Sequence, residues 1–190
     1  DLLSASGHKI HGPKGVGLLY AGEKVKFRLM ILGGGQQNGM RSGTDNVPGI
    51  AGMAAAARKI YGSLEENRAH MYRVKKKLAE GLAQMDNVVI HGMAIEEGAP
   101  HILNASFPGV RSEVLLHALE DKGIYVSAGS ACSSHKRSAS ATLSAIGCSR
   151  AELESAVRFS FCEYTSEEEI EETLRALHAL LPMLRKFTRR

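Results

Sequence analysis

The spacing of apolar residues along the chain predicts alternating strands and helices. Short apolar runs bounded by Gly and Pro are typical of strands, and they occur at residues 2–6, 15–20, 88–91, 102–107, 124–127 and 157–161. Apolar residues spaced three and four apart are typical of helices. This spacing runs from about residue 48 through residue 82, with a bend near Gly62, and recurs at residues 112–123, 138–146, 151–156 and 167–184. The pattern predicts an α/β fold.

The long helix divides the predicted elements into two groups. Regular alternation of strands and helices begins only after it, so we expect residues 1–62 to belong to one domain and residues 63–190 to form a second, small α/β domain. Ser112 is the predicted cap of the helix at residues 112–123, and Thr165 or Ser166 is the predicted cap of the last helix.

Composition excludes several classes of protein. At 190 residues and 44% hydrophobic the chain can bury a core, and its 23% of charged residues mix both signs, which argues against disorder. The net charge of +4 comes with basic clusters only at residues 73–77 and 185–190, without interleaved aromatics, so we expect no nucleic-acid partner. No apolar run reaches the ~18 residues of a membrane span, so we expect no membrane partner.

The cysteines and the first residue carry two further expectations. Cys132, Cys148 and Cys162 form no CxxC pair, and without a secretory signal this odd count favours a reducing cytoplasm. The chain opens with Asp1 directly on a predicted strand, which we interpret as a sign of residues missing upstream.

The first candidate motif surrounds Lys9. A lysine that forms a Schiff base needs a rigid, partly desolvated position that keeps its amine neutral often enough to react. Ser6 and His8 offer a hydroxyl and an imidazole that can donate to a nearby phosphate. An exposed lysine beside a turn is the alternative interpretation of the same residues.

The second motif is the small-residue run around Cys132. Ser, Ala and Gly neighbours offer little bulk to bury the sulfur, and Lys136 and Arg137 favour its thiolate. We expect the loop over about residues 128–139 to be mobile and to carry Cys132 between two partners. The alternative is a buried structural cysteine. A metal site is disfavoured, because Cys132 and His135 form only a weak pair of ligands.

The third motif is Arg158, which lies in an otherwise apolar and aromatic run. A charge in such a strand needs a partner, because an unpaired buried charge is costly. That partner is either a carboxylate of the protein or a substrate carboxylate held in a bidentate fork.

Together the motifs resemble the NifS/IscS-like cysteine desulfurases of the class V aminotransferase family. The matching segments are Ser6-Gly7-His8-Lys9, Gly12-Pro13-Lys14-Gly15, Arg41-Ser42-Gly43-Thr44, the Ser127 to Ser134 run, Arg158-Phe159-Ser160 and Thr165-Ser166-Glu167-Glu168-Glu169. The resemblance implies a fold-type-I enzyme that uses pyridoxal 5'-phosphate (PLP), built from part of the large PLP-binding domain and a C-terminal small domain. It also implies a homodimer with active sites at the subunit interface.

The resemblance assigns a role to each matching residue. Lys9 is expected to form the Schiff base, Ser6 and His8 to bind the cofactor phosphate, and Thr44 to contact the phosphate in the partner subunit's site. Cys132 is expected to accept sulfur from L-cysteine as a persulfide, with L-alanine as the product, while Arg158 holds the substrate carboxylate. An iron–sulfur scaffold or a thiolation enzyme is the expected sulfur-acceptor protein.

The chain also departs from that family. Family members are roughly double its length, and the other half carries the aspartate that pairs with the pyridine nitrogen and the aromatic residue that stacks on PLP. We therefore expect this chain alone to be inactive, and we interpret Cys162 as structural. Two rival functions are another class V activity (an aminotransferase or a selenocysteine lyase) and a non-catalytic docking or dimerisation fragment. Cys132 in its loop argues against a plain aminotransferase.

Overall fold

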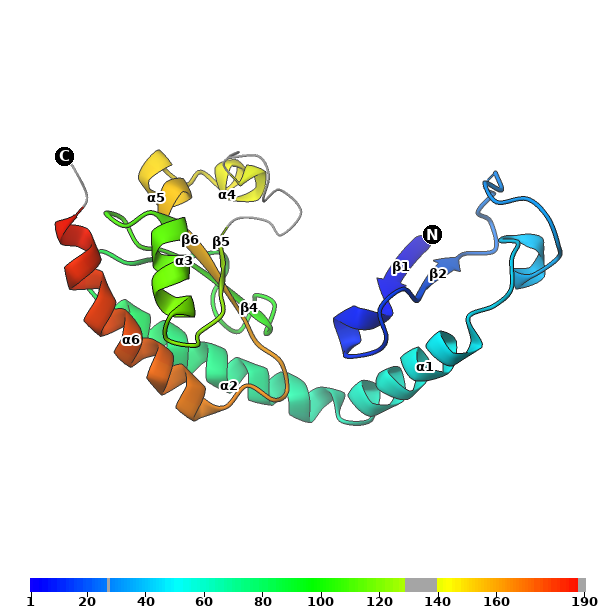
Figure 1. The fold of residues 1–190 in the computed structure, drawn as a ribbon, viewed down its shortest axis with the longest axis horizontal. Helices are drawn as coiled ribbons and strands as arrows, with labels where there is room; N and C mark the ends of the chain where they lie inside the picture. The colour runs from blue at the N-terminus through cyan, green and yellow to red at the C-terminus, as the bar shows by residue number, and fades with distance from the viewer. Residues whose placement is uncertain (27, 129–139, 188–190) are drawn as a thin grey trace. The chain divides into compact units, whose positions relative to one another are not determined.

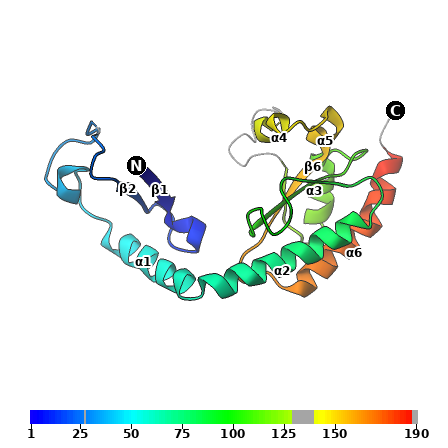
Figure 2. The same ribbon diagram turned by 180° about the vertical axis from the view of Figure 1, so that it is seen from behind.

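A computed structural model describes residues 1–26, 28–128 and 140–187. The chain forms two compact units, Asp1–Leu64 and Glu65–Arg190, whose elements can be followed in Figures 1 and 2. Both contain helices and strands, which confirms the predicted α/β class. Assignment of the units to the large and small domains of a PLP enzyme stays a prediction.

The first unit is a hairpin followed by loops and a helix. Strand β1 (Leu2–Ser6) pairs antiparallel with β2 (Gly17–Ala21), and the short 3-10 helix η1 (Gly7–Ile10) begins the connection between them. A second 3-10 turn, η2 (Gln37–Gly39), precedes helix α1 (Val47–Gly62). The Asn46 side chain caps α1 by accepting from the Gly49 N–H at 3.1 Å. Several large apolar side chains of the hairpin are exposed: Leu2, Leu3, Leu18, Leu19 and Tyr20.

The predicted long helix is present as two helices. Helix α1 ends at Gly62, and α2 (Leu64–Ala83) begins after Ser63, whose backbone is not helical. The helix is thus interrupted at the predicted place, next to Gly62. Pro13 lies so close to Gly52 of α1 that a Cβ there would meet its ring at 2.6 Å, which packs the η1–β2 connection onto the helix.

The second unit is a four-stranded antiparallel sheet covered by helices. Its strands lie in the order β3 (Val89–His91), β4 (Ile102–Ser106), β6 (Ala156–Ser160) and β5 (Ser127–Ala128). The helices are α3 (Ser112–Glu120), α4 (Ala141–Ala145), α5 (Arg150–Ser155) and α6 (Glu167–Lys186). The core joins one face of the sheet to α2, α3 and α6, and its fully buried side chains include Val74, Leu78, Leu82, Leu115, Leu119, Val157 and Leu177.

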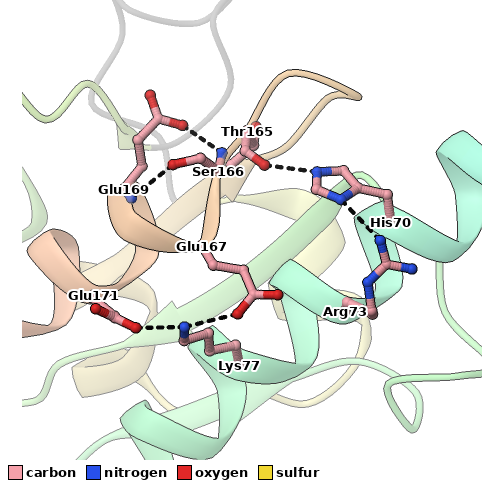
Figure 3. Close-up of polar contacts among 8 residues, drawn as sticks. All are labelled: His70, Arg73, Lys77, Thr165, Ser166, Glu167, Glu169 and Glu171. Atoms are coloured by element: carbon pink, nitrogen blue, oxygen red, sulfur yellow. Dashed lines mark hydrogen bonds and ion pairs between the residues drawn. The ribbon is translucent and has the colours of Figure 1, made fainter.

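Helices α2 and α6 lie side by side, and polar contacts fasten the start of α6 (Figure 3). The Lys77 ammonium contacts the carboxylates of Glu171 at 2.6 Å and Glu167 at 2.9 Å. These carboxylates raise the pKa of Lys77, and the Lys77 ammonium lowers the pKa of Glu167. The His70 ring contacts the Thr165 carbonyl oxygen at 2.8 Å. The segment that leaves β6 is thus tied to α2.

Some predicted boundaries were wrong. Ser112 is the first residue of α3 rather than its cap. Arg111 occupies the N-cap position, and its side chain forms no capping hydrogen bond. The strand expected at residues 124–127 is reduced to β5, since Ile124 and Val126 pack against the core outside the strand ladder. Helix α4 begins at Ala141, capped by Ser140.

The cap of α6 resolves the alternative left open by the sequence. Ser166 and Glu169 form a reciprocal capping box, drawn in Figure 3. Thr165 instead accepts from the Cys162 N–H through its hydroxyl oxygen. Within the described part of the chain, no helix combines the length and apolar character needed to cross a membrane.

Candidate functional site

The turn after β1 carries Ser6, His8 and Lys9 on a backbone that is held by hydrogen bonds. Ser6 ends β1, and the other two residues lie in η1. Between them Gly7 is buried, donates its N–H to the Val16 carbonyl oxygen at 2.9 Å and accepts at its own carbonyl from the Gly12 N–H at 2.9 Å. A Cβ at Gly7 would lie 3.0 Å from both the Pro13 oxygen and the Val16 side chain. The turn therefore has a fixed shape that depends on glycine.

The donor set of this turn fits the two ends of PLP. The hydroxyl of Ser6 and the imidazole of His8 can donate to a phosphate, and the Lys9 amine can bond covalently to an aldehyde carbon. All three side chains are exposed. The first unit supplies the rigid backbone expected of such a lysine, but its described residues do not bury the amine.

Thr44 lies on the loop that leads into α1. The preceding residues fasten this loop, because the buried Ser42 hydroxyl donates to the Gly34 carbonyl oxygen at 2.7 Å and the Gly43 N–H donates to the Gln36 side chain at 3.2 Å. Thr44 itself is exposed. Its expected contact with a cofactor in a partner subunit stays a prediction.

Cys132 and the predicted shuttle loop lie outside the described residues. Residues 129–139 separate β5 from the Ser140 cap of α4. The roles of Cys132 as sulfur acceptor and of residues 128–139 as a mobile loop therefore stay predictions.

Arg158 lies in the middle of β6, flanked in register by Asn104 of β4 and Ser127 of β5. Its side chain is half-buried, and its Nε atom is fully buried without a hydrogen-bond partner. Among the described residues no carboxylate forms an ion pair with Arg158. The sequence left two candidate partners for Arg158, a carboxylate of the protein and a substrate carboxylate. The described part of the chain provides no protein carboxylate for it.

A chain of hydrogen bonds around Cys148 was not predicted from the sequence. The Cys148 Sγ lies 3.4 Å from His91 Nδ1, and His91 Nε2 lies 2.6 Å from the Ser106 hydroxyl oxygen. Because the Ser106 hydroxyl donates its one proton to the Glu152 carbonyl oxygen at 2.8 Å, it must accept from His91 Nε2–H. Nδ1 is then the unprotonated nitrogen and accepts from the Cys148 thiol. Residues 57 positions apart meet here, which local pattern cannot anticipate.

The surroundings of Cys148 and His91 favour the neutral forms of the thiol and the imidazole. Burial, followed by the Glu152 carboxylate, raises the pKa of the Cys148 thiol. Burial also lowers the pKa of His91, which outweighs the opposing effect of Glu152. A thiolate–imidazolium pair, the form that activates nucleophilic cysteines, is therefore disfavoured.

We expect Cys148 to react slowly with iodoacetamide at pH 8, because only the thiolate is nucleophilic and a raised pKa reduces its population. The rate should keep increasing as the pH rises above the ordinary thiol range. Mass spectrometry of the Cys148 peptide measures it, with the urea-unfolded chain as control. Equal rates in the folded and unfolded chains would contradict this expectation.

Comparison with known proteins agrees with the motifs. The sequence profile of the family described as Aminotransferase class-V matches residues 1–173. A NifS/IcsS protein homolog of Lactobacillus delbrueckii is 41% identical over 93% of this chain and 46% of its own length. Cysteine desulfurase IscS of Klebsiella pneumoniae is 40% identical over 99% of this chain and 46% of its own length. The chain spans about half the length of the curated relatives it matches.

Solved structures show the same relationship in three dimensions. A protein described as NifS-like is 38% identical, with a TM-score of 0.86 over 97% of this chain and 47% of the other. The apo cysteine desulfurase of Thermococcus onnurineus is 27% identical, with a TM-score of 0.82 over 97% of this chain and 48% of the other. By its sequence profile, its relatives and its fold, the chain belongs to the class V aminotransferase family.

Proposed function

We propose that this chain acts as part of a PLP-dependent cysteine desulfurase, which transfers sulfur from L-cysteine to Cys132 and releases L-alanine. The observation that carries the proposal is the 40–41% identity, over nearly the whole chain, to proteins named cysteine desulfurase. Two features of the structure support it: the hydrogen-bonded turn that carries Lys9, and the Arg158 Nε atom that has no partner. In this proposal the active unit, called the complete enzyme below, has the length of those relatives.

The proposed roles divide between binding and proton transfer. Ser6 and His8 would donate to the cofactor phosphate, and the Lys9 amine would hold the cofactor covalently. PLP, when bound, supplies an electron sink for charge that develops at the substrate Cα. The Lys9 amine would also move the proton at that Cα, while Arg158 would hold the substrate carboxylate.

The sulfur-transfer step belongs to Cys132. Its thiolate attacks the substrate sulfur, so that a sulfur–sulfur bond forms as the bond between substrate Cβ and sulfur breaks. The carbon fragment keeps the electron pair, takes up a proton and leaves as L-alanine, and Cys132 carries the persulfide. One cysteine and one protein thiol thus give one alanine and one persulfide, with no external oxidant.

The proposal includes partners and location. The complete enzyme is a cytoplasmic homodimer in which Thr44 contacts the cofactor phosphate held by the partner subunit. The persulfide sulfur passes to an acceptor protein of iron–sulfur cluster or thio-cofactor synthesis.

Replacing Arg158 with Ala tests the substrate-binding part of the proposal. We expect the affinity of the complete enzyme for L-cysteine to fall by about 2–5 kcal/mol, the usual loss when one partner of a buried charge pair is removed, which is roughly 30- to 5,000-fold. Steady-state kinetics with varied cysteine measure the change. Arg175→Ala, which removes an exposed arginine of α6, serves as the matched control.

A normal apparent affinity for cysteine in the Arg158→Ala enzyme, combined with a lower urea midpoint, would assign Arg158 a structural role instead.

A further inference from the structure

Two buried atoms without a hydrogen-bond partner belong to residues that are directly opposite each other on strands β4 and β6. Among the described residues, Asn104 Oδ1 and Arg158 Nε are both buried without a hydrogen-bond partner. Buried polar atoms in proteins are nearly always paired, and an unpaired one costs free energy. One of these atoms is an acceptor and the other is an N–H donor, so each is the kind of partner that the other lacks.

The register places the two side chains together. Asn104 is directly opposite Arg158 in the antiparallel β4–β6 pair, and directly opposite residues point to the same face of a sheet with Cβ atoms about 5 Å apart. Their neighbours Leu103 and Val157 are buried in the core on the other face. The side chains of Asn104 and Arg158 therefore lie next to each other on the same face of the sheet.

Asn104 also has a neighbour on strand β3, and the hydrogen-bonding atoms of that neighbour already have partners. His91 of β3 is directly opposite Asn104, but its two ring nitrogens contact Cys148 and Ser106. Within the described sheet, Asn104 is the neighbour of Arg158 whose buried acceptor atom, Oδ1, has no hydrogen-bond partner.

We propose that Asn104 is a positioning residue for Arg158: its side-chain oxygen accepts from Nε–H and orients the guanidinium plane. The two terminal nitrogens then remain free to form a bidentate fork around the substrate carboxylate. This inference rests on the proposed function, because it assigns Asn104 a part in recognising the carboxylate of cysteine. It implies that Asn104 contributes to binding only of substrates with a free carboxylate.

The first test measures the hydrogen bond without any catalysis. In ¹H–¹⁵N spectra of the chain, the Arg158 Nε–H resonance, assigned by its loss in Arg158→Lys, should exchange slowly with solvent. Asn104→Leu keeps a similar side-chain volume but removes the oxygen, and should accelerate this exchange. Asn67→Leu, which changes an asparagine of α2, is the matched control. Unchanged exchange in Asn104→Leu would overturn the assignment.

The second test separates positioning from packing in the complete enzyme. Asn104→Leu should raise KM for L-cysteine roughly tenfold, the scale of one hydrogen bond to a charged group, with kcat nearly unchanged. Binding of cysteine methyl ester, which lacks the carboxylate, should not change. In an Arg158→Lys background, which has no guanidinium Nε–H, Asn104→Leu should have no further effect on KM.

The outcomes distinguish this inference from the function on which it rests. A KM increase that persists in the Arg158→Lys background, or an equal loss for the methyl ester, would show that Asn104 only packs and would overturn the assignment alone. Failure of the unsubstituted complete enzyme to release alanine from cysteine would overturn the proposed function, and this assignment with it.

Discussion

Replacing Lys9 with Ala is expected to abolish alanine formation and to leave no PLP covalently attached to the complete enzyme. The proposal gives the Lys9 amine two tasks, holding the cofactor and moving the Cα proton. Loss of a positioned acid–base group alone typically costs 10²- to 10⁴-fold in rate. The turn that presents Lys9 is fixed by the Gly7 backbone hydrogen bonds, so the substitution should leave the fold intact.

Borohydride reduction followed by peptide mapping measures the attachment directly. The unsubstituted enzyme should carry reduced PLP on Lys9, and Lys14→Ala should behave the same way, because Lys14 lies outside the short helix η1 that holds Lys9. Reduced PLP found on Lys14 would move the assignment to that residue.

The second large effect is expected from Cys132→Ser. A serine hydroxyl is a poor nucleophile toward sulfur, so this variant should bind PLP and cysteine but release no alanine in a single turnover. Rapid-quench measurement of alanine tests it. Cys148→Ser should retain activity because the Cys148 thiol is held neutral by a raised pKa, and Cys162→Ser should also retain activity.

Alanine released by Cys132→Ser at the unsubstituted rate would show that Cys132 is not the acceptor. The sulfur would then have to be sought on Cys148 or Cys162.

The elements of the fold could be predicted because each carries a local signal. The apolar spacing of α2 and α6 and the Ser166–Glu169 pair before a helix are properties of neighbouring residues. Strand β5 was predicted too long because Ile124 and Val126 are apolar for packing rather than for ladder pairing. Apolar character alone does not separate these two causes.

The candidate site was predicted less completely, because its contacts depend on register. The sequence marked Arg158 as a charge in an apolar strand, but Asn104 becomes relevant only through the β4–β6 pairing. The Cys148–His91 contact likewise requires the sheet to bring together residues that are distant in sequence. The exposed hairpin side chains Leu2 and Leu19 show a third limit: a pattern predicts a strand without stating what covers its faces.

The most direct measurement of the central claim follows sulfur and carbon together. The complete enzyme, loaded with PLP, is mixed with one equivalent of L-cysteine, and both alanine and the modified cysteine peptide are quantified. The account predicts equal amounts of alanine and of persulfide, with the extra sulfur on the Cys132 peptide. Alanine formed with free elemental sulfur and no protein persulfide, or a persulfide on Cys148 or Cys162, would contradict it.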